Sequence, residues 1–510
     1  MFHMTPDAWV SSVAFGMLFT LIGAVSISAA TLNVGDRKQL FIDRKFIAAS
    51  ENVILAMNPP EKRGIVLSGE YPWESGWVGA GEMIIEDQGK CRMWYRCYSP
   101  GKDGKLGRGA FCYAESADGI HWVKPMLGQV KWPGDEHSEK RGETNMLPLD
   151  GGTVFLDPSA PAPERYKVLR SMYWPDPAKA GLYIGVSPDG VHWKTNPNRL
   201  LPFSPDTTNQ VFYDVRLRKY VAYMRTWAPM RKIGRVEIEK LFEPWPYDKT
   251  QKPNFIWGKD KVPVPSNEFH QAISYDELDP PQTDLYTPAV HQYPWADDAY
   301  FAFPSPYRHF PDPPKGKYWN DGLLDIQLAV SRDGVTFQRP IRSPYIPLGL
   351  RGGLEGGSMY MSIGMIRRGA EIYQYYTGFA NTHGEYVGFK ELKGMGGIRL
   401  ALQRLDGFMS ADFAYAGGTL TTPPLTFTGH RLRLNVNASA LGVLQVELRD
   451  AEGQPIPGFT REDCDPVQGN SVSAEVAWRG KSDVSTLAGK AVQIHFTGRA
   501  AKLYAFQFSD

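Results

Sequence analysis

Four carboxylates that are far apart in the sequence lie just before, or at the start of, apolar stretches that we expect to form strands. They are Glu74, Asp206, Asp284 and Glu355. If these strands open separate repeat units around one axis, the carboxylates converge on a single funnel. Two facing carboxyl groups can cleave a glycosidic bond, because a protonated one supplies the leaving oxygen with a proton while an ionised one attacks or activates water. Crowding of like charges keeps one of them protonated near neutral pH.

Other side chains in these segments could hold a sugar. Asn145 and Asp150 occupy the corresponding place in the second unit. Aromatic rings stack on the apolar faces of sugars, and amide, imidazole or guanidinium groups hydrogen-bond hydroxyls. The candidate substrate-binding residues are Trp73, Trp77, Asn145, Asn209, Arg225, Trp227 and His383. Each has a structural alternative, as a core aromatic or as an internal hydrogen-bond partner.

A short phrase that occurs three times indicates which elements position these residues. Ser116–Trp122, Ser187–Trp193 and Ser331–Phe337 share the pattern Ser-x-Asp-Gly-x-x-aromatic, with first residues 71 and then 144 positions apart, the second interval being two steps of 72. Ser and Asp oxygens accept local backbone N–H groups, and Gly accepts a positive φ. The phrase therefore predicts a tight turn, and its Asp residues are expected to form turns rather than to catalyse.

An apolar run precedes each phrase, and five units with several strands each can be parsed between Trp77 and Leu402. A fixed period of this size, with strands and almost no helix, is typical of a β-propeller. From about Ser410 onward, apolar and polar residues alternate over some 100 positions, which predicts an antiparallel β-sandwich. The predicted fold is all-β: a five-bladed β-propeller over 31–409 followed by a C-terminal antiparallel β-sandwich over 410–510.

Residues 10–30 form an apolar stretch that ends in small residues near Ala30, as in a secretory signal peptide over 1–30. The segment before it carries Asp7 and neither Lys nor Arg, so two alternatives stay open: a later start at Met4 or Met17, or an uncleaved anchor. In each case we expect a secreted or periplasmic protein.

The charge balance of 56 basic and 55 acidic residues argues against a nucleic acid or an anionic membrane surface as partner. We expect a carbohydrate partner that is neutral or weakly charged. Cys97 and Cys112 could form one disulfide between neighbouring strands, which leaves Cys464 unpaired. His270 has acidic neighbours, but no ligand spacing is specific for a metal, and nothing supports Ca²⁺ at the axis. We expect neither a metal nor another cofactor.

The five-unit plan, the repeated turns, the phrase Gly-Lys-Cys-Arg-Met-Trp-Tyr at 89–95 and the trailing sandwich resemble the five-bladed propeller glycosidases of glycoside hydrolase families 32, 43 and 68. Over roughly 35–510 the chain resembles secreted bacterial family 32-like proteins in particular. The resemblance implies an Asp nucleophile or base in the first blade, a second Asp that stabilises the transition state, and a Glu acid in a later blade. The chain lacks Trp-Met-Asn-Asp-Pro-Asn, Arg-Asp-Pro and Glu-Cys-Pro, so fructan specificity is not implied.

The predicted function is a glycoside hydrolase acting on a plant or algal oligosaccharide or polysaccharide. Glu355 or Asp284 would be the acid, and Glu74 or Asp206 the base or nucleophile. The alternative is a non-catalytic carbohydrate-binding propeller, and a protein-interaction module is less favoured because the funnel candidates are acidic rather than apolar. An enzyme requires two facing carboxyls roughly 5 to 9.5 Å apart, whereas a binding module does not.

Overall fold

The computed structural model describes residues 30–100, 106–132, 143–172, 179–227, 229–247, 255–257, 262–311, 321–385 and 395–510. Apart from Ala30, the predicted signal segment lies outside the described residues. The described residues form strands and short 3₁₀ helices without an α-helix, and no helix among them is long and apolar enough to cross a membrane. The all-β expectation is confirmed.

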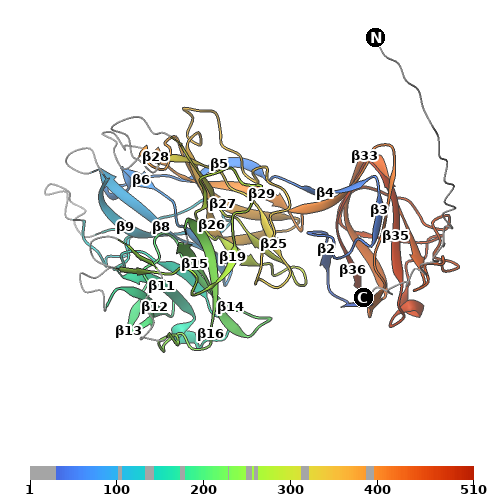
Figure 1. Cartoon of the computed structure of the whole chain (residues 1–510), viewed down its shortest axis with the longest axis horizontal. Helices are drawn as coiled ribbons and strands as arrows, with labels where there is room; N and C mark the ends of the chain where they lie inside the picture. Colours follow the sequence, from blue (N-terminus) through green and yellow to red (C-terminus); the bar gives the residue numbers. More distant parts are fainter. Residues whose placement is uncertain are drawn as a thin grey trace, which may run out of the picture.

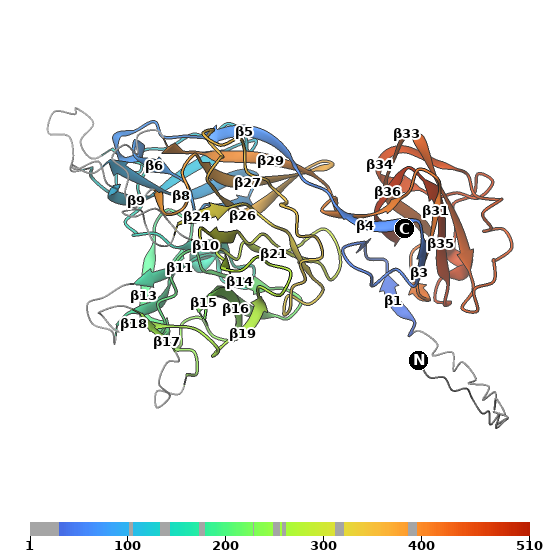
Figure 2. The ribbon, with the colours of Figure 1, turned by 45° about the horizontal axis from the view of Figure 1, so that its top comes forward.

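The chain forms two lobes, a propeller and a sandwich, connected by extended chain (Figures 1 and 2). Five successive antiparallel units make up the propeller. The first blade consists of β7 (Met83–Asp87), β8 (Lys90–Pro100) and β9 (Leu106–Ser116), and the second of β10 (Thr153–Leu156), β11 (Tyr166–Met172), β12 (Gly181–Ser187) and β13 (Lys194–Leu201). The third blade consists of β14 (Gln210–Asp214), β15 (Lys219–Trp227), β16 (Arg231–Ile238) and β19 (His270–Ile273), and the fourth of β21 (Val290–Gln292), β22 (Tyr300–Ala302) and β25 (Ala329–Ser331). The fifth blade consists of β26 (Ser358–Arg368), β27 (Glu371–Phe379), β29 (Ile398–Arg404) and β5 (Glu61–Leu67). Single bridges from Val123 and Gln338 take the outer places of the first and fourth blades.

Shorter strands extend these blades. β6 (Trp77–Val78) pairs with β8 and β28 (Met395–Gly396), and β17 (Phe255–Trp257) forms a hairpin with β18 (Val262–Val264). β20 (Thr283–Leu285), β23 (Pro306–His309) and β24 (Gly322–Leu324) form a further antiparallel group beside β26. Two of the candidate site residues lie in these additional strands: Trp77 in β6 and Asp284 in β20.

The fifth blade closes the ring with a strand from the other end of the chain. β5 pairs antiparallel with β29, so residues 61–67 form its outermost strand. The five units predicted from the sequence begin only at Trp77, so β5 lies outside them, and its first residues, Glu-Lys-Arg-Gly, show no apolar alternation. An outer strand needs none, since one side of it faces water, and most of β5 is exposed or half-buried.

The repeated phrase forms the predicted turn in all three places. In the first copy, Ser116 Oγ accepts a hydrogen bond from the Gly119 N–H at 2.9 Å, and Asp118 Oδ1 accepts one from Ile120 N–H at 2.8 Å. The same bonds recur in the other copies. The turn-forming role of these Asp side chains is confirmed.

Each of these turns is also fixed to the preceding blade. An aromatic side chain of that blade's second strand donates a hydrogen bond to the carbonyl of the turn glycine. The pairs are Trp94 Nε1 to Gly190, Tyr223 OH to Gly334, and Tyr375 OH to Gly119. The last pair joins the fifth blade to the first, so the repeat phrase both turns the chain and closes the ring.

Two blades differ in detail from the prediction. The sequence predicts an eroded turn at 236–239 and an insertion over 246–283, but β16 continues as far as Ile238, and the fourth strand of the third blade is β19, inside that insertion. The apolar run from Tyr286 predicts that the fourth blade begins there, whereas its first strand begins at Val290. In both places the Ser-x-Asp-Gly signal or the apolar run is weak, and hydrogen bonding to the neighbouring strand decides the boundary.

The sandwich combines both ends of the chain. Its strands are β30 (Met409–Phe413), β31 (Gly418–Thr421), β32 (Leu425–Phe427), β33 (Arg431–Arg449), β34 (Val467–Glu475), β35 (Gln493–Arg499) and β36 (Ala501–Ser509), joined by β1 (Leu32–Gly35), β2 (Gln39–Leu40), β3 (Ala49–Glu51) and β4 (Val53–Met57). The long strand β33 pairs with β36 in its first half and with β35 in its second. Residues 32–57, which the prediction placed in the propeller domain, therefore pair with the C-terminal sheets.

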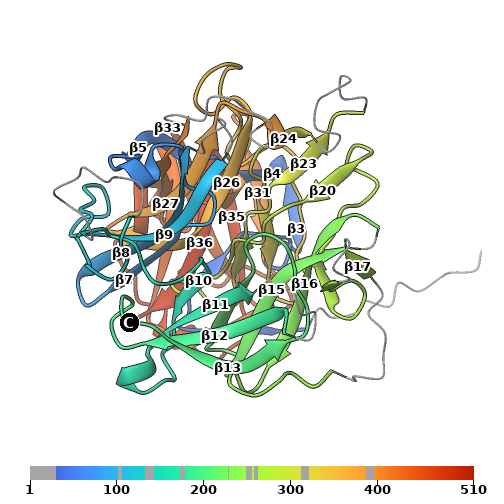
Figure 3. The same cartoon turned by 90° about the vertical axis from the view of Figure 1, so that its left-hand side faces the viewer.

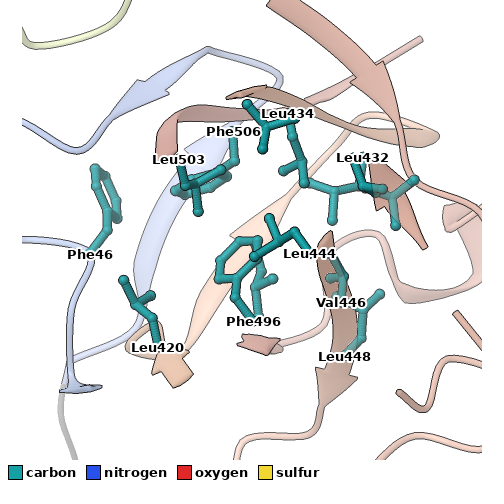
Figure 4. Packing of buried hydrophobic residues seen from close by; sticks show 14 of the residues in the cluster. Phe46, Leu420, Leu432, Leu434, Leu444, Val446, Leu448, Phe496, Leu503 and Phe506 are labelled. Carbon is teal, nitrogen blue, oxygen red and sulfur yellow. The ribbon is translucent and has the colours of Figure 1, made fainter. Parts of the chain in front are cut away.

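The sandwich core lies between these layers (Figure 4). Phe496, Phe506, Leu434 and Leu444 are almost wholly buried in it. A second cluster, which includes Leu40, Phe301 and Phe408, joins the sandwich to the fourth and fifth blades. The two lobes thus share an apolar contact, which burial of non-polar area stabilises.

All four cysteines are free and buried. Cys97 and Cys112 lie on the neighbouring strands β8 and β9 with their sulfur atoms 3.4 Å apart. The predicted proximity is therefore present, without a disulfide in this structure.

Candidate active site

Two adjoining cavities form one hollow that is lined by residues of the blades. Figure 3 shows the lobe that these blades form, turned toward the viewer. The volumes of the two cavities are about 500 and 160 Å³, and residues of both walls are shared: Ala80, Gly81, Arg96, Thr207 and Thr208. The first three blades line the larger cavity, and the first, third, fourth and fifth line the smaller. The hollow is within the size range of small-molecule sites and takes residues from all five blades.

A Gly-Ala-Gly segment brings the backbone close to this hollow. Gly79, Ala80 and Gly81 have φ values of +123°, +59° and +136°. A Cβ at Gly79 would lie 2.4 Å from the side chain of Thr377, so only glycine fits there. The segment therefore forms part of the wall of the hollow and lies against Thr377 of the fifth blade.

Asp206 is the one of the four predicted carboxylates that lines the hollow. Its side chain is 60% exposed, while Arg225, which donates a hydrogen bond to it at 2.6 Å, is fully buried. Arg225 is held from behind by the carbonyl of Tyr286, over whose ring the guanidinium lies, and its own N–H donates to Asn209 Oδ1. The protein that encloses the hollow partly desolvates Asp206 and raises its pKa, but the positive charges of Arg225 and Arg231 outweigh this effect and lower the pKa overall.

Aromatic side chains dominate the smaller cavity. Trp77 and Tyr98 line it as a stacked pair with ring centroids 5.1 Å apart, and Tyr286 and Tyr360 complete the wall. His383 also lines it and is hydrogen-bonded to the hydroxyl of Tyr360 through Nδ1. Burial and the positive charges of Arg225 and Arg231 lower the pKa of His383 to about 3, so its imidazole is neutral at ordinary pH.

Glu74 lies outside the hollow, contrary to the prediction. Its carboxylate is 0% exposed and forms an ion pair with Lys124 at 2.8 Å. It also accepts hydrogen bonds from Tyr95 and from backbone N–H groups. Asn145 and Trp73 belong to the same buried network, because Trp73 Nε1 donates to Asn145 and Asn145 donates to Tyr95. These three residues fix the chain entering the first blade, and none lines the hollow.

Asp284 and Glu355 are held in other ion pairs. Asp284 accepts hydrogen bonds from Arg231 and from His309 at 2.8 Å; burial raises its pKa, but these partners lower it overall. Trp227 covers the guanidinium of Arg231 from 4.1 Å and likewise does not line the hollow.

Glu355 accepts hydrogen bonds from Lys62 at 3.0 Å and Tyr376 at 2.6 Å, on the far strands of the fifth blade. Neither it nor Asp284 lines the hollow. The sequence placed each near the start of a blade but did not reveal its basic partner, which comes from a distant strand.

Several residues of the hollow were not among the predicted site residues. Asp150 was named only as a substitute in the second blade, and it lines the larger cavity with its side chain fully exposed, 3.8 Å from Arg170. Arg96 and Tyr98 lie two residues apart on β8 and face the hollow together. Arg96 and Tyr98 alternate along β8 with the buried Tyr95 and Cys97. This alternation is the sequence signal that could have predicted that both residues face the hollow.

Glu82 follows the Gly-Ala-Gly wall directly and is fully buried. Its carboxylate accepts hydrogen bonds from Ser362 at 2.7 Å and Thr377 at 2.8 Å, both from the fifth blade. Burial raises the pKa of Glu82, and this effect outweighs the two hydrogen bonds, which by themselves favour the ionised form. Within the described residues, no group of three or more His, Cys, Asp or Glu side chains could hold a metal ion.

No protein-family model matches the chain, and no curated protein does. Solved structures of glycoside hydrolases are similar to it. A thermostable family-43 glycoside hydrolase is 14% identical and covers 69% of this chain and 95% of its own, with a TM-score of 0.41. A glycosyl hydrolase from Bacteroides ovatus is 13% identical over 72% and 96% of the two chains, with a TM-score of 0.42.

The exo-inulinase from Aspergillus awamori is 11% identical over 89% of this chain and 99% of its own, with a TM-score of 0.41. These proteins are of the enzyme class that the sequence resembles. At this identity and TM-score, the similarity by itself assigns neither a family nor a substrate to this chain.

Proposed function

We propose that the protein is a glycoside hydrolase whose substrate binds in the axial hollow. The observation that carries this proposal is the presence of two carboxylates from different blades, Asp206 and Asp150, in one cavity that also holds hydrogen-bonding side chains. Beside it, Trp77 and Tyr98 offer aromatic surface of the kind on which sugars stack.

In this proposal Asp206 is the ionised partner, because its pKa is lowered and it therefore remains a carboxylate at working pH. Asp150 supplies the proton to the leaving oxygen. It is exposed in the free protein, so a bound sugar can reach it. Water then adds to the anomeric carbon, either directly or after a covalent intermediate on Asp206.

A plant or algal glycan remains our proposed substrate, and export of the protein remains our proposal from the apolar N-terminal stretch. Export is tested by expressing the full chain with a C-terminal tag in a Gram-negative host and determining the N-terminal residue of the exported protein. Cleavage near Ala30 supports a signal peptide, and retention of residues 1–30 in the membrane fraction supports an anchor.

A non-catalytic carbohydrate-binding propeller is the second candidate. One observation favours it: Glu82, a carboxyl beside the hollow whose pKa burial raises, is completely enclosed and cannot reach a substrate in this conformation. In such a module, Asp206 and Asp150 would accept hydrogen bonds from sugar hydroxyls without taking part in a reaction.

Reducing-sugar release from arabinan, fructan, xylan and algal polysaccharides distinguishes the two candidates. The wild type is compared with Asp206→Asn, Asp150→Asn and the control Asp36→Asn, which changes an exposed carboxylate in the sandwich lobe. Release that both hollow variants lose and the control keeps supports a hydrolase. Glycan binding without release, by wild type and variants alike, supports the binding module instead.

A further inference from the structure

The wall of the hollow carries an arginine, Arg96, that forms no ion pair within the part of the chain that the structure describes. Arg96 lines both cavities and is half-buried. Other arginines around the hollow have carboxylate neighbours: Arg225 is 2.6 Å from Asp206, and Arg170 is 3.8 Å from Asp150. Over the ranges that the structure describes, the Arg96 guanidinium has neither a hydrogen bond nor an ion pair.

The backbone opposite Arg96 makes room for the guanidinium. A Cβ placed on Gly151 would lie 2.3 Å from Arg96 Nη2, and Gly151 has a φ of +124°. A larger residue at 151 would therefore displace the guanidinium from its present position and would also strain the backbone. Glycine at 151 thus lets the guanidinium lie close to the backbone in the wall of the hollow.

The charged residues that line the larger cavity differ in their pairing. Asp206 and Asp150 each have an arginine neighbour, Arg225 and Arg170, whereas Arg96 forms no ion pair among the described residues. A half-buried cation without a partner favours an anion from solution, and a guanidinium binds planar or tetrahedral oxyanions with two parallel hydrogen bonds. Tyr98, on the same face of β8, extends the aromatic wall beside it.

We propose that Arg96 binds an acidic substituent of the sugar, either the carboxylate of a uronic acid or a sulfate ester. This proposal rests on the proposed carbohydrate function of the hollow and replaces the expectation of a neutral glycan with that of an anionic one. The aromatic pair Trp77 and Tyr98 would contact the sugar ring while Arg96 holds the charged group.

Ligand-observed NMR titration with free monosaccharides tests this, because these sugars contain no glycosidic bond that the protein could cleave. The pairs are D-galacturonate with D-galactose, D-glucuronate with D-glucose, and galactose 6-sulfate with galactose. The proteins are the wild type, Arg96→Gln, Arg96→Lys, and Arg351→Gln as the control, since Arg351 is exposed and lies outside the hollow.

We expect at least one acidic sugar to bind the wild type about 10- to 100-fold more tightly than its neutral counterpart. Arg96→Gln should remove that preference without weakening the neutral sugar, Arg96→Lys should keep part of it, and Arg351→Gln all of it. A preference for a uronate identifies a carboxylate as the group bound, and a preference for the 6-sulfate identifies a sulfate ester.

Equal affinities for acidic and neutral sugars in every pair, or a preference that survives Arg96→Gln, would overturn the proposal. Hydrolysis of a neutral glycan together with equal affinities refutes the role of Arg96 and leaves the hydrolase proposal standing. An Arg96-dependent preference in a protein that hydrolyses nothing refutes the hydrolase and keeps the anionic ligand.

Discussion

Asp206 accepts a 2.6 Å hydrogen bond from Arg225, and the two side chains differ sharply in exposure: the carboxylate is 60% exposed and the guanidinium 0%. A fully buried cation thus holds a carboxylate at the wall of the hollow. The pair orients Asp206 and keeps it ionised, which is the state that a base or nucleophile requires.

The first prediction concerns this carboxylate. Asp206→Asn should lower glycan hydrolysis by about 10²- to 10⁴-fold, because the amide can neither activate water nor attack. Initial rates of sugar release, with Asp36→Asn as control, measure the effect. Circular dichroism must show that the variant is folded, since the change also leaves Arg225 without its carboxylate. Full activity in a folded Asp206→Asn protein would exclude the role.

The pH dependence of activity follows from the same pair. The folded-state pKa of Asp206 is lowered, so the carboxylate stays ionised as the pH falls. It becomes protonated only below the ordinary Asp range near about 4. We expect any loss of kcat/KM that is due to Asp206 to occur below that range. Suppose that kcat/KM instead falls with decreasing pH already above about pH 5, and that Asp206→Asn abolishes this fall. The assignment of Asp206 as the group that stays ionised would then be contradicted.

The Glu74–Lys124 pair supports the second prediction, a structural one. Both side chains are buried, so Glu74→Gln leaves the Lys124 ammonium group with only its longer ion pair to Glu70, at 3.6 Å, and should lower the free energy of unfolding by up to about 3–5 kcal/mol. The double variant Glu74→Gln/Lys124→Met should recover part of this loss. Urea unfolding measures both, and folded Glu74→Gln should retain hydrolysis; selective loss of hydrolysis at unchanged stability would restore Glu74 as a catalytic candidate.

Glu82 gives a third prediction with the opposite sign of pH dependence. Its folded-state pKa is raised, so the folded protein retains a proton that the unfolded chain releases, and stability falls as the pH rises above the unfolded value. Glu82→Gln does not titrate and can still accept the hydrogen bonds of Ser362 and Thr377. Its Tm should therefore exceed that of the wild type at about pH 8 and match it near about pH 4. A difference that does not change with pH would show that Glu82 is not held protonated.

His383 supports a fourth prediction. With a pKa of about 3, its imidazole should remain neutral from about pH 5 to 8. A ¹H–¹³C NMR titration of the histidine ring signals, with the His383 signal identified by its absence in His383→Gln, should show no shift in that range. Titration near about pH 6.5 would mean that the cavity around His383 is open to solvent.

Local chemistry determined much of the fold. The Ser-x-Asp-Gly turns needed only side-chain oxygens, a glycine and an aromatic residue close together in sequence, so residues 116–122, 187–193 and 331–337 behave as predicted. Their period led to five blades, and alternation led to the sandwich. The pairing of strands β1 to β5 was not predicted, because their partners come from the other end of the chain and no local pattern reports such pairing.

The site divided in the same way. The position of a residue relative to the strands of a blade can be predicted from the sequence. Four of the residues predicted in this way line the hollow: Asp206, Asn209, Trp77 and His383. Whether a carboxylate faces a cavity or a cation depends on residues from distant strands: Lys124 holds Glu74, Arg231 holds Asp284, and Lys62 with Arg399 holds Glu355. Tertiary structure alone decided these pairs, because ion pairing depends on distance in space and not on separation along the chain.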